Sequence, residues 1–212
     1  MKAQSAPYLA TYSLAARDPR SGALGVAVAS KFLAVGALVP FVRAGVGAVA
    51  TQARTNLAYG PAVLDLLEDG GRPDEAVRAV RSADESAQYR QLGVVAADGR
   101  SAGATGSGCR EWAGNVCGPD FAIQGNILAG PQVLEAMTAA WEQAAGLGFP
   151  QKLLAVLRAG EEHGGDARGK QSAALLVVLP DGTKTDLRVD DHREPVAELG
   201  RLLSLCEAGG QR

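Results

Sequence analysis

The pattern of apolar positions divides the chain into short strands and helices of moderate length. Residues 9–17 form a run of small and β-branched residues, residues 22–32 form a second run, and Asp18-Pro-Arg-Ser-Gly22 lies between them. Turn residues between two such arms predict an opening antiparallel hairpin. The pairing puts Thr11 near the middle of the first arm and Lys31 at the end of the second. We therefore expect a hydroxyl group and an amine to face one cleft.

Small residues without polar alternation dominate the segment 45–52. This pattern favours a strand covered on both faces, whose polar end, Thr51-Gln52, emerges at a sheet edge or in a cleft. Asp98-Gly99 separates two further runs and predicts a second hairpin. The remaining expected strands are residues 91–97, 101–106, 120–128, 172–179 and 185–189, whereas residues 107–114 are expected to form a compact irregular loop.

Helix signals separate these groups of strands. Prolines such as Pro61 and Pro73 suit the first turn of a helix, acids such as Asp74 complement its dipole, and glycine pairs such as Gly70-Gly71 supply a left-handed exit. The apolar stripe Val133, Met137 and Trp141 is expected to be core. Helices are predicted at residues 61–69, 73–81, 131–145, 150–163 and 195–206.

The order of elements favours an α+β fold. Tight hairpins rather than helical crossovers join successive strands, which indicates mainly antiparallel sheets. Buried strands and enough helices for two outer layers predict two stacked sheets between helices. We expect an N-terminal extension over residues 1–10 and a single domain over residues 11–208.

Composition narrows the functional classes. The 212 residues include 47% hydrophobic residues, enough for a sizeable core, and the net charge of −2 gives no basic field for nucleic acid. No segment approaches the ~20 uncharged apolar residues of a membrane span. The three cysteines are an odd number, which suits a reducing compartment, and they leave open whether Cys109 and Cys117 pair. The expectation is a cytoplasmic protein without nucleic-acid or membrane partners.

No metal or nucleotide cofactor is expected. The two histidines and three cysteines lack zinc-ligand spacing. Residues 164–171, Gly-Gly-Asp-Ala-Arg-Gly-Lys-Gln, come close to a phosphate-binding loop, but Gln171 stands where a magnesium-binding Ser or Thr is needed. The segment also follows a predicted helix and precedes a strand, which is the reverse of the required order.

Two polar clusters remain as candidate sites, each with a structural alternative. Asp166 could orient Arg168 for a bidentate grip on a carboxylate or amide, with Gln171 nearby, or the pair could be a weak surface ion pair. Gln124 and Asn126 could cap loose backbone groups at a strand bulge. Alternatively, Asn126 could donate to an oxyanion while Gly125 lets the substrate approach the backbone. Cys109 and Trp112 are expected to be loop core.

Five motifs resemble one family over nearly the whole chain. They are Thr11-Tyr-Ser-Leu-Ala-Ala-Arg-Asp-Pro, Gly25-Val-Ala-Val-Ala-Ser-Lys-Phe, Gly45-Val-Gly-Ala-Val-Ala-Thr-Gln, Gln124-Gly-Asn-Ile-Leu-Ala-Gly and Gly164-Gly-Asp-Ala-Arg-Gly-Lys-Gln-Ser-Ala-Ala-Leu. Together they resemble the bacterial family called domain of unknown function 1028. The resemblance implies the N-terminal-nucleophile (Ntn) hydrolase fold, a four-layer αββα sandwich, and a homodimer.

The resemblance also implies roles for individual residues. Thr11 would be the nucleophile with its own α-amine as base, Lys31 would tune the electrostatics, and Asn126 would stabilise the oxyanion. Asp166 and Arg168 would hold substrate. Ten residues precede Thr11, so this chemistry requires cleavage of the Ala10–Thr11 bond. The remaining candidate substrate-binding residues are Thr51, Gln52, Gln124 and Gln171.

Two functional hypotheses follow. The first is an Ntn-type amidohydrolase that acts on a small linear or cyclic amide. The second is a non-catalytic small-ligand-binding or scaffold protein that keeps the fold. The state of the Ala10–Thr11 bond separates them.

Overall fold

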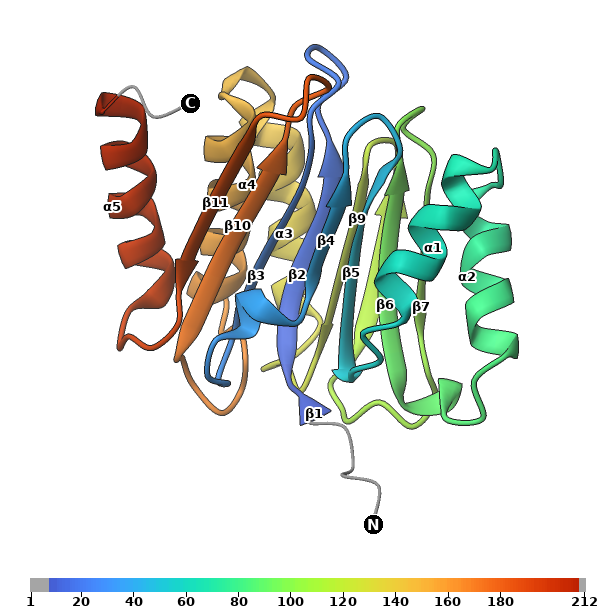
Figure 1. Ribbon diagram of the computed structural model, residues 1–212. Helices are drawn as coiled ribbons and strands as arrows, with labels where there is room; N and C mark the ends of the chain where they lie inside the picture. The colour runs from blue at the N-terminus through green and yellow to red at the C-terminus, as the bar shows by residue number, and fades with distance from the viewer. Residues whose placement is uncertain (1–7, 210–212) are drawn as a thin grey trace, which may run out of the picture.

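Two antiparallel sheets stack face to face in the computed structural model, which describes residues 8–209 (Figure 1). Part of the expected N-terminal extension, residues 1–7, lies outside the described residues. The first sheet has the order β1-β5-β6-β7, with β4 also paired to β5, and the second has the order β11-β10-β3-β2-β9-β8. The strands are β1 Tyr8–Leu9, β2 Thr11–Arg17, β3 Leu24–Ser30, β4 Pro40–Arg43, β5 Gly47–Arg54, β6 Arg90–Ala96, β7 Ser101–Thr105, β8 Gly114–Gly118, β9 Phe121–Asn126, β10 Ser172–Val178 and β11 Lys184–Val189.

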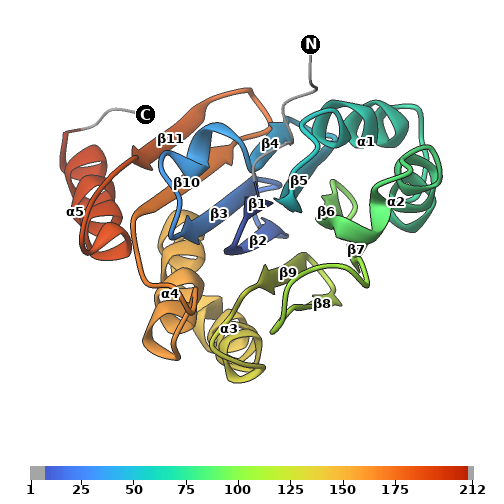
Figure 2. The ribbon, with the colours of Figure 1, turned by 90° about the horizontal axis from the view of Figure 1, so that it is seen from below.

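Helices cover both outer faces, as the view along the sandwich shows (Figure 2). Helices α1 and α2 pack on the first sheet, and α3, α4 and α5 pack on the second. The four layers confirm the predicted αββα sandwich. The helices are α1 Tyr59–Glu68, α2 Pro73–Ser82, α3 Gln132–Gln143, α4 Phe149–Glu162 and α5 Pro195–Ala208. No helix among residues 8–209 is long and apolar enough to span a membrane.

Local signals account for the helix ends. Pro73 occupies the first turn of α2, and the Glu75 carboxylate accepts a hydrogen bond from the Arg72 amide (3.2 Å). Gly70 and Gly164 follow α1 and α4 with φ of 88° and 110°, the left-handed conformation that glycine adopts without strain.

The alternation of side chains along the strands separates three apolar layers. On β2, Tyr12 and Leu14 face α3–α5, whereas Ala15 faces the other sheet. A third cluster lies between the first sheet and helices α1 and α2. Side chains that point from one sheet toward the other are apolar at one end of the sandwich and polar at the other. The polar ones are Thr11, Ser13, Ser30, Gln52, Gln91, Gln124, Asn126 and Ser172, and all of them are buried.

Both predicted hairpins are confirmed. Strands β2 and β3 pair from Thr11↔Ser30 to Arg17↔Leu24, and β6 pairs with β7 around the turn at Gly99. Three strands were not predicted, namely the two-residue β1, β4 and β8. Strand β8 contains two glycines and an asparagine, so its local pattern is that of a loop, and its pairing with β9 forms it.

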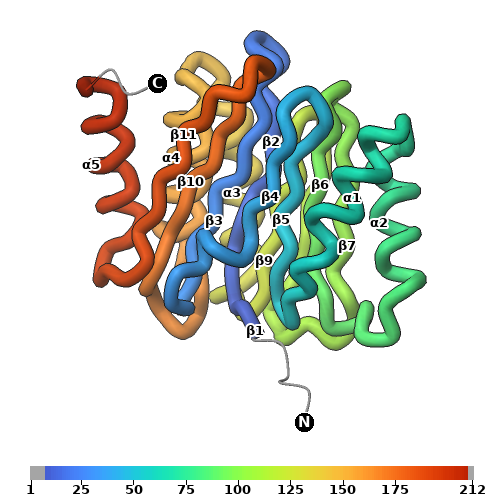
Figure 3. Tube along the Cα trace, viewed as in Figure 1, coloured from blue at the N-terminus to red at the C-terminus, as the bar shows by residue number. Residues whose placement is uncertain are grey.

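The expected position of Thr11 in the middle of an arm is wrong, because Thr11 is the first residue of β2. Tyr8 and Leu9 pair with β5 in the first sheet, whereas Thr11 pairs with β3 and β9 in the second. The chain therefore crosses from one sheet to the other at Ala10. The tube in Figure 3 shows this crossing at the end of the sandwich opposite the β2–β3 turn.

Candidate functional site

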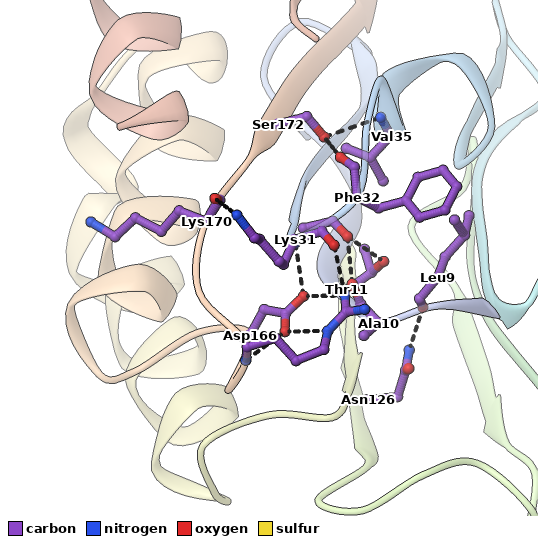
Figure 4. A network of polar contacts seen from close by, with 12 residues as sticks. Leu9, Ala10, Thr11, Lys31, Phe32, Val35, Asn126, Asp166, Lys170 and Ser172 are labelled. Carbon is purple, nitrogen blue, oxygen red and sulfur yellow. Dashed lines mark hydrogen bonds and ion pairs between the residues drawn. The ribbon is translucent and has the colours of Figure 1, made fainter. Parts of the chain in front are cut away.

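The carbonyl group of Ala10 is the centre of the candidate site (Figure 4). At the crossing point, side chains supply its hydrogen bonds: Ser30 Oγ donates to the Ala10 oxygen at 2.5 Å, and Arg168 Nη2 donates at 3.3 Å. Thr11 Oγ1 in turn donates to Ser30 Oγ at 3.4 Å. Thr11 and Ala10 are both 0% exposed. The Thr11 hydroxyl, the Ser30 hydroxyl and the Ala10 carbonyl thus form one buried chain of hydrogen bonds.

Asp166 fixes the orientation of Arg168. Its carboxylate accepts hydrogen bonds from Arg168 Nε (3.0 Å) and Nη2 (2.8 Å), and from the amides of Arg168 (3.0 Å) and Lys31 (2.8 Å). The Asp166 side chain is 1% exposed and that of Arg168 is 39% exposed. The alternative of a weak surface pair is therefore wrong for Asp166. This carboxylate joins the loop after α4 to the end of β3.

The loop carrying Asp166 is held against the strand that carries Asn126. The Ala167 amide donates to the Ile127 carbonyl (2.9 Å), and the Ala129 amide donates to the Gly165 carbonyl (3.1 Å). A side chain at Gly164 would meet the Ala129 methyl group at 2.5 Å, so glycine allows this close approach.

Amide side chains continue the site between the two sheets. Asn126 Nδ2 donates to the Leu9 carbonyl and to Gln91 Oε1, each at 3.1 Å. Gln52 Nε2 donates to the Thr11 carbonyl (3.1 Å) and to Gln91 Oε1 (2.8 Å). Asn126 Oδ1 is buried without a hydrogen-bond partner among the described residues. The network therefore holds the backbone on both sides of the Ala10–Thr11 bond.

Gln124 extends this network through Ser13. Gln124 Nε2 donates to Ser13 Oγ, which donates to Gln52 Oε1, each at 2.6 Å. The ladder between β2 and β9 is regular here, so the bulge of the structural alternative is absent from this segment, although Asn126 does bond a backbone carbonyl as that alternative proposed. The expected role of Gly125 is also wrong: a Cβ there would lie 2.5 Å from Leu128 Cδ1, so the space holds Leu128 rather than substrate.

Three expected site residues lie elsewhere. Lys31 Nζ donates to the Lys170 carbonyl (3.2 Å) on the exposed side, so its ammonium group does not share a cleft with Thr11. Gln171 Nε2 donates to Asp191 (3.1 Å) at the surface. The Thr51 side chain points to the outer face of β5, away from the other sheet, and is 0% exposed. Its Oγ1 donates to the Asn56 carbonyl (3.4 Å). Thr51 therefore does not emerge in a cleft.

The polar groups missed from the sequence are Ser13, Ser30 and Gln91. The sequence does contain a signal for Ser30, because Ser30 follows Leu24, Val26 and Val28 at a spacing of two and so points to the same inner face of the sheet. Polar residues at the ends of apolar strands, on the face that the apolar residues bury, indicate a buried polar layer.

Two titratable groups near the site, Tyr12 and Cys109, have raised pKa values. Burial raises the pKa of Tyr12 well above its ordinary value, and the carboxylates of Glu161 and Asp166 raise it further. Burial also raises the pKa of the Cys109 thiol. Cys109 is buried and Trp112 packs against the core, as expected for loop core. Cys109 and Cys117, whose pairing the sequence left open, are both free thiols.

A family model and one solved structure identify the family of this chain. The model of the Family of unknown function (DUF1028) matches residues 11–199. A crystal structure of a DUF1028 protein from Silicibacter pomeroyi is similar at 37% identity and a TM-score of 0.86, covering 93% of this chain and 89% of that chain. Anbu (ancestral beta-subunit) from Yersinia bercovieri shows 15% identity and a TM-score of 0.42, with 95% and 97% coverage. Anbu from Hyphomicrobium sp. strain MC1 shows 14% and 0.41 at the same coverage. No curated protein matches. The chain belongs to the DUF1028 family.

Proposed function

We propose that the protein is an N-terminal-nucleophile amidohydrolase that cleaves its own Ala10–Thr11 bond and then hydrolyses a small amide with Thr11. One observation carries the proposal: the Ala10 carbonyl oxygen accepts hydrogen bonds from Ser30 and Arg168 while the adjacent Thr11 hydroxyl contacts Ser30. Donors aimed at a carbonyl oxygen stabilise the negative charge that develops there when the carbon is attacked.

The self-cleavage step uses this chain of hydroxyl groups. Thr11 Oγ1 attacks the Ala10 carbonyl carbon, its proton moves to Ser30 Oγ, and the Ser30 proton moves to the carbonyl oxygen. Collapse of the intermediate breaks the C–N bond as the proton on the oxygen passes to the Thr11 nitrogen. Ala10 is then an ester on Thr11. Water hydrolyses the ester to the Ala10 carboxylate and a free Thr11.

The freed Thr11 has the groups that amide hydrolysis needs. An α-amine has an ordinary pKa near ~8, so at neutral pH part of it is unprotonated and can accept the hydroxyl proton. Thr11 then attacks the carbonyl carbon of the substrate, the amine of the substrate leaves, and water hydrolyses the acyl ester. Overall, an amide and water give a carboxylate and an amine.

Departure of residues 1–10 also makes room for a substrate. Leu9 and Ala10 are both 0% exposed and occupy the space next to Thr11. Their removal frees Asn126 Nδ2 from the Leu9 carbonyl, and frees Ser30 and Arg168 from the Ala10 carbonyl. We therefore expect a substrate whose reactive carbonyl takes the place of that of Ala10 and whose acyl group fills the apolar space of Leu9.

The test is hydrolysis of a panel of N-acyl amides by a chain that begins at Thr11, released from a fusion partner. We expect turnover by this chain, retained activity in Thr11→Ser and loss of activity in Thr11→Ala. Equal rates for the chain and its Thr11→Ala variant would contradict the proposal. The non-catalytic ligand-binding protein would then be the better account.

A further inference from the structure

A cavity of about 530 Å³ opens on the surface beside the candidate site. Its lining residues are Lys31, Lys170, Gln171, Asp191, His192 and Arg193. The proposed reaction does not use these side chains. Lys31 follows Ser30 directly, and its backbone is part of the site, because its amide donates to Asp166 (2.8 Å) and its carbonyl accepts from Arg168 (3.0 Å). The cavity and the Ala10 carbonyl thus lie on two sides of one short segment.

The three cations that line this cavity differ in whether a carboxylate neutralises them. Lys170 Nζ lies between two carboxylates, 3.0 Å from Glu161 and 2.5 Å from Glu194, so its charge is neutralised. Lys31 Nζ has only the backbone carbonyl of Lys170 as a partner among the described residues, and Figure 4 shows it reaching away from Thr11. Arg193 makes no ion pair within residues 8–209.

The other lining groups leave Lys31 and Arg193 without a carboxylate partner among the described residues. Asp191 already accepts a hydrogen bond from Gln171 Nε2 (3.1 Å). The amide of Glu194 donates to His192 Nδ1 (3.0 Å), which places the proton of the neutral ring on Nε2 and makes that nitrogen a donor. The His192 amide donates to the Gln171 carbonyl (2.8 Å), so this wall of the cavity is tied to the chain entering β10.

We propose that this cavity binds a carboxylate group of the substrate, with Lys31 and Arg193 as its cationic partners and His192 as an additional donor. The inference rests on the proposed function and narrows its substrates to small amides that carry a carboxylate, such as N-acyl amino acids. Lys31 and Arg193 are the lining cations without a carboxylate partner among the described residues, and Asp191 lies beside them. With Lys170, Glu161 and Glu194 included, three cations and three carboxylates balance. Because this leaves no net positive charge, a monocarboxylate suits the cavity better than a phosphate dianion, which would meet Asp191 and the nearby Glu194 with twice the charge.

The experiment measures binding rather than turnover. The full-length Thr11→Ala variant, which cannot cleave itself by the proposed route, is titrated with N-acetylglycine, N-acetyl-β-alanine and N-acetyl-γ-aminobutyrate, with the corresponding neutral carboxamides, and with inorganic phosphate. Amide signals of Lys31, His192 and Arg193 are followed by NMR. We expect saturable shifts with at least one carboxylate, at least about tenfold weaker binding of its carboxamide and of phosphate, and weakening by salt.

Charge-matched variants identify the partners. In the same background, Lys31→Gln and Arg193→Gln should each weaken carboxylate binding by about tenfold, whereas Lys184→Gln, an exposed lysine on β11, should leave it unchanged. Equal binding of acid and carboxamide, tighter binding of phosphate, or an equal loss in Lys184→Gln would overturn the inference. If the variant binds the carboxylate but the wild-type protein never cleaves its Ala10–Thr11 bond, the carboxylate site stands and only the proposed function is contradicted.

Discussion

At the scale of single residues, Asp166 is a loop carboxylate that is only 4% exposed. It accepts four hydrogen bonds, from Arg168 Nε and Nη2 and from two backbone amides, and thereby holds Arg168 against the Ala10 carbonyl. The protein contains a natural comparison, because Arg188 and Asp190 have the same spacing of two residues but side chains that are 36% and 53% exposed.

This comparison gives the first prediction. Asp166→Asn should lower the free energy of unfolding by about 2 kcal/mol, because buried donors lose a charged acceptor. Asp190→Asn should change it by less than ~0.5 kcal/mol, since exposed ion pairs contribute little. Urea unfolding at pH 7 measures both variants. Equal losses would show that the burial of Asp166 has no energetic consequence.

Ser30 gives the second prediction. Ser30→Ala removes the 2.5 Å donor to the Ala10 carbonyl and should slow cleavage of the Ala10–Thr11 bond by about 100-fold, the usual effect of losing one oxyanion donor. Ser172, the cross-strand neighbour of Ser30 on β10, donates instead to the Phe32 carbonyl. Ser172→Ala should therefore cleave at nearly the wild-type rate in a time course of intact mass. A similar slowing in both variants would point to a general packing effect.

At the scale of elements, the two sheets approach closely at the polar end because β6 carries a glycine opposite a large side chain of β9. A Cβ at Gly93 would lie 1.8 Å from Gln124 Oε1 and 2.5 Å from its Cδ. Gln124 is 0% exposed and is bonded to Ser13, so it cannot move aside freely. The missing side chain on β6 therefore makes room for the buried network.

The third prediction follows from this contact. Gly93→Ala should lower the free energy of unfolding by about 2 kcal/mol or more, as overpacking of a tight core does. Gly146→Ala is the control, because nothing lies within 4 Å of a Cβ there, and it should be neutral or stabilising by up to ~1 kcal/mol. Chemical denaturation compares the two. An unchanged free energy of unfolding in Gly93→Ala would show that the space between the sheets can hold an additional methyl group.

A second connection between elements lies at Asp84, after α2. Its carboxylate accepts hydrogen bonds from Tyr59 of α1 (2.9 Å), from Arg90 of β6 (2.8 Å) and from Asn56 (3.3 Å). Burial by itself raises the pKa of Asp84, but these hydrogen bonds outweigh it and hold the pKa well below its ordinary value. Asp84 thus stabilises the packing of α1 and α2 on the first sheet only while it is ionised.

The fourth prediction concerns acid stability. Because the pKa of Asp84 is lower in the folded chain than in the unfolded chain, its contribution is complete above about pH 4 and is lost as the pH falls towards the folded value. Between pH 7 and pH 3 the wild type should lose about 1 kcal/mol through this group. Asp84→Asn should be less stable at pH 7 and lose correspondingly less on acidification. If the free energies of unfolding of the wild type and of Asp84→Asn, measured in urea, fall by the same amount between pH 7 and pH 3, this prediction is wrong.

At the scale of the whole molecule, the chain begins its described part in one sheet and continues in the other. Strand β1 pairs with β5 and strand β2 pairs with β3 and β9, so the Ala10–Thr11 bond lies where the two sheets are joined. The polar end of the layer between the sheets surrounds this bond, and the proposed carboxylate cavity opens beside it.

Much of this architecture could be predicted because its signals are local. Turn residues at 18–22 and 98–99 marked both hairpins, and prolines and glycines marked the helices. Strand β8 was missed because pairing with β9, rather than its own composition, makes it a strand. Thr11, Asn126, Asp166 and Arg168 were predicted as site residues, and the structure brings them into one network. The direction of the Lys31 side chain could not be predicted, because it depends on the Lys170 carbonyl, 139 residues away in sequence.

The most direct test of the account is the denaturing intact mass of freshly purified full-length protein, before and after treatment with a threonine-directed β-lactone. We predict a species that begins at Thr11, lacks residues 1–10 and gains one adduct on Thr11. A full-length chain that remains unmodified would contradict the central claim that Thr11 is an N-terminal nucleophile.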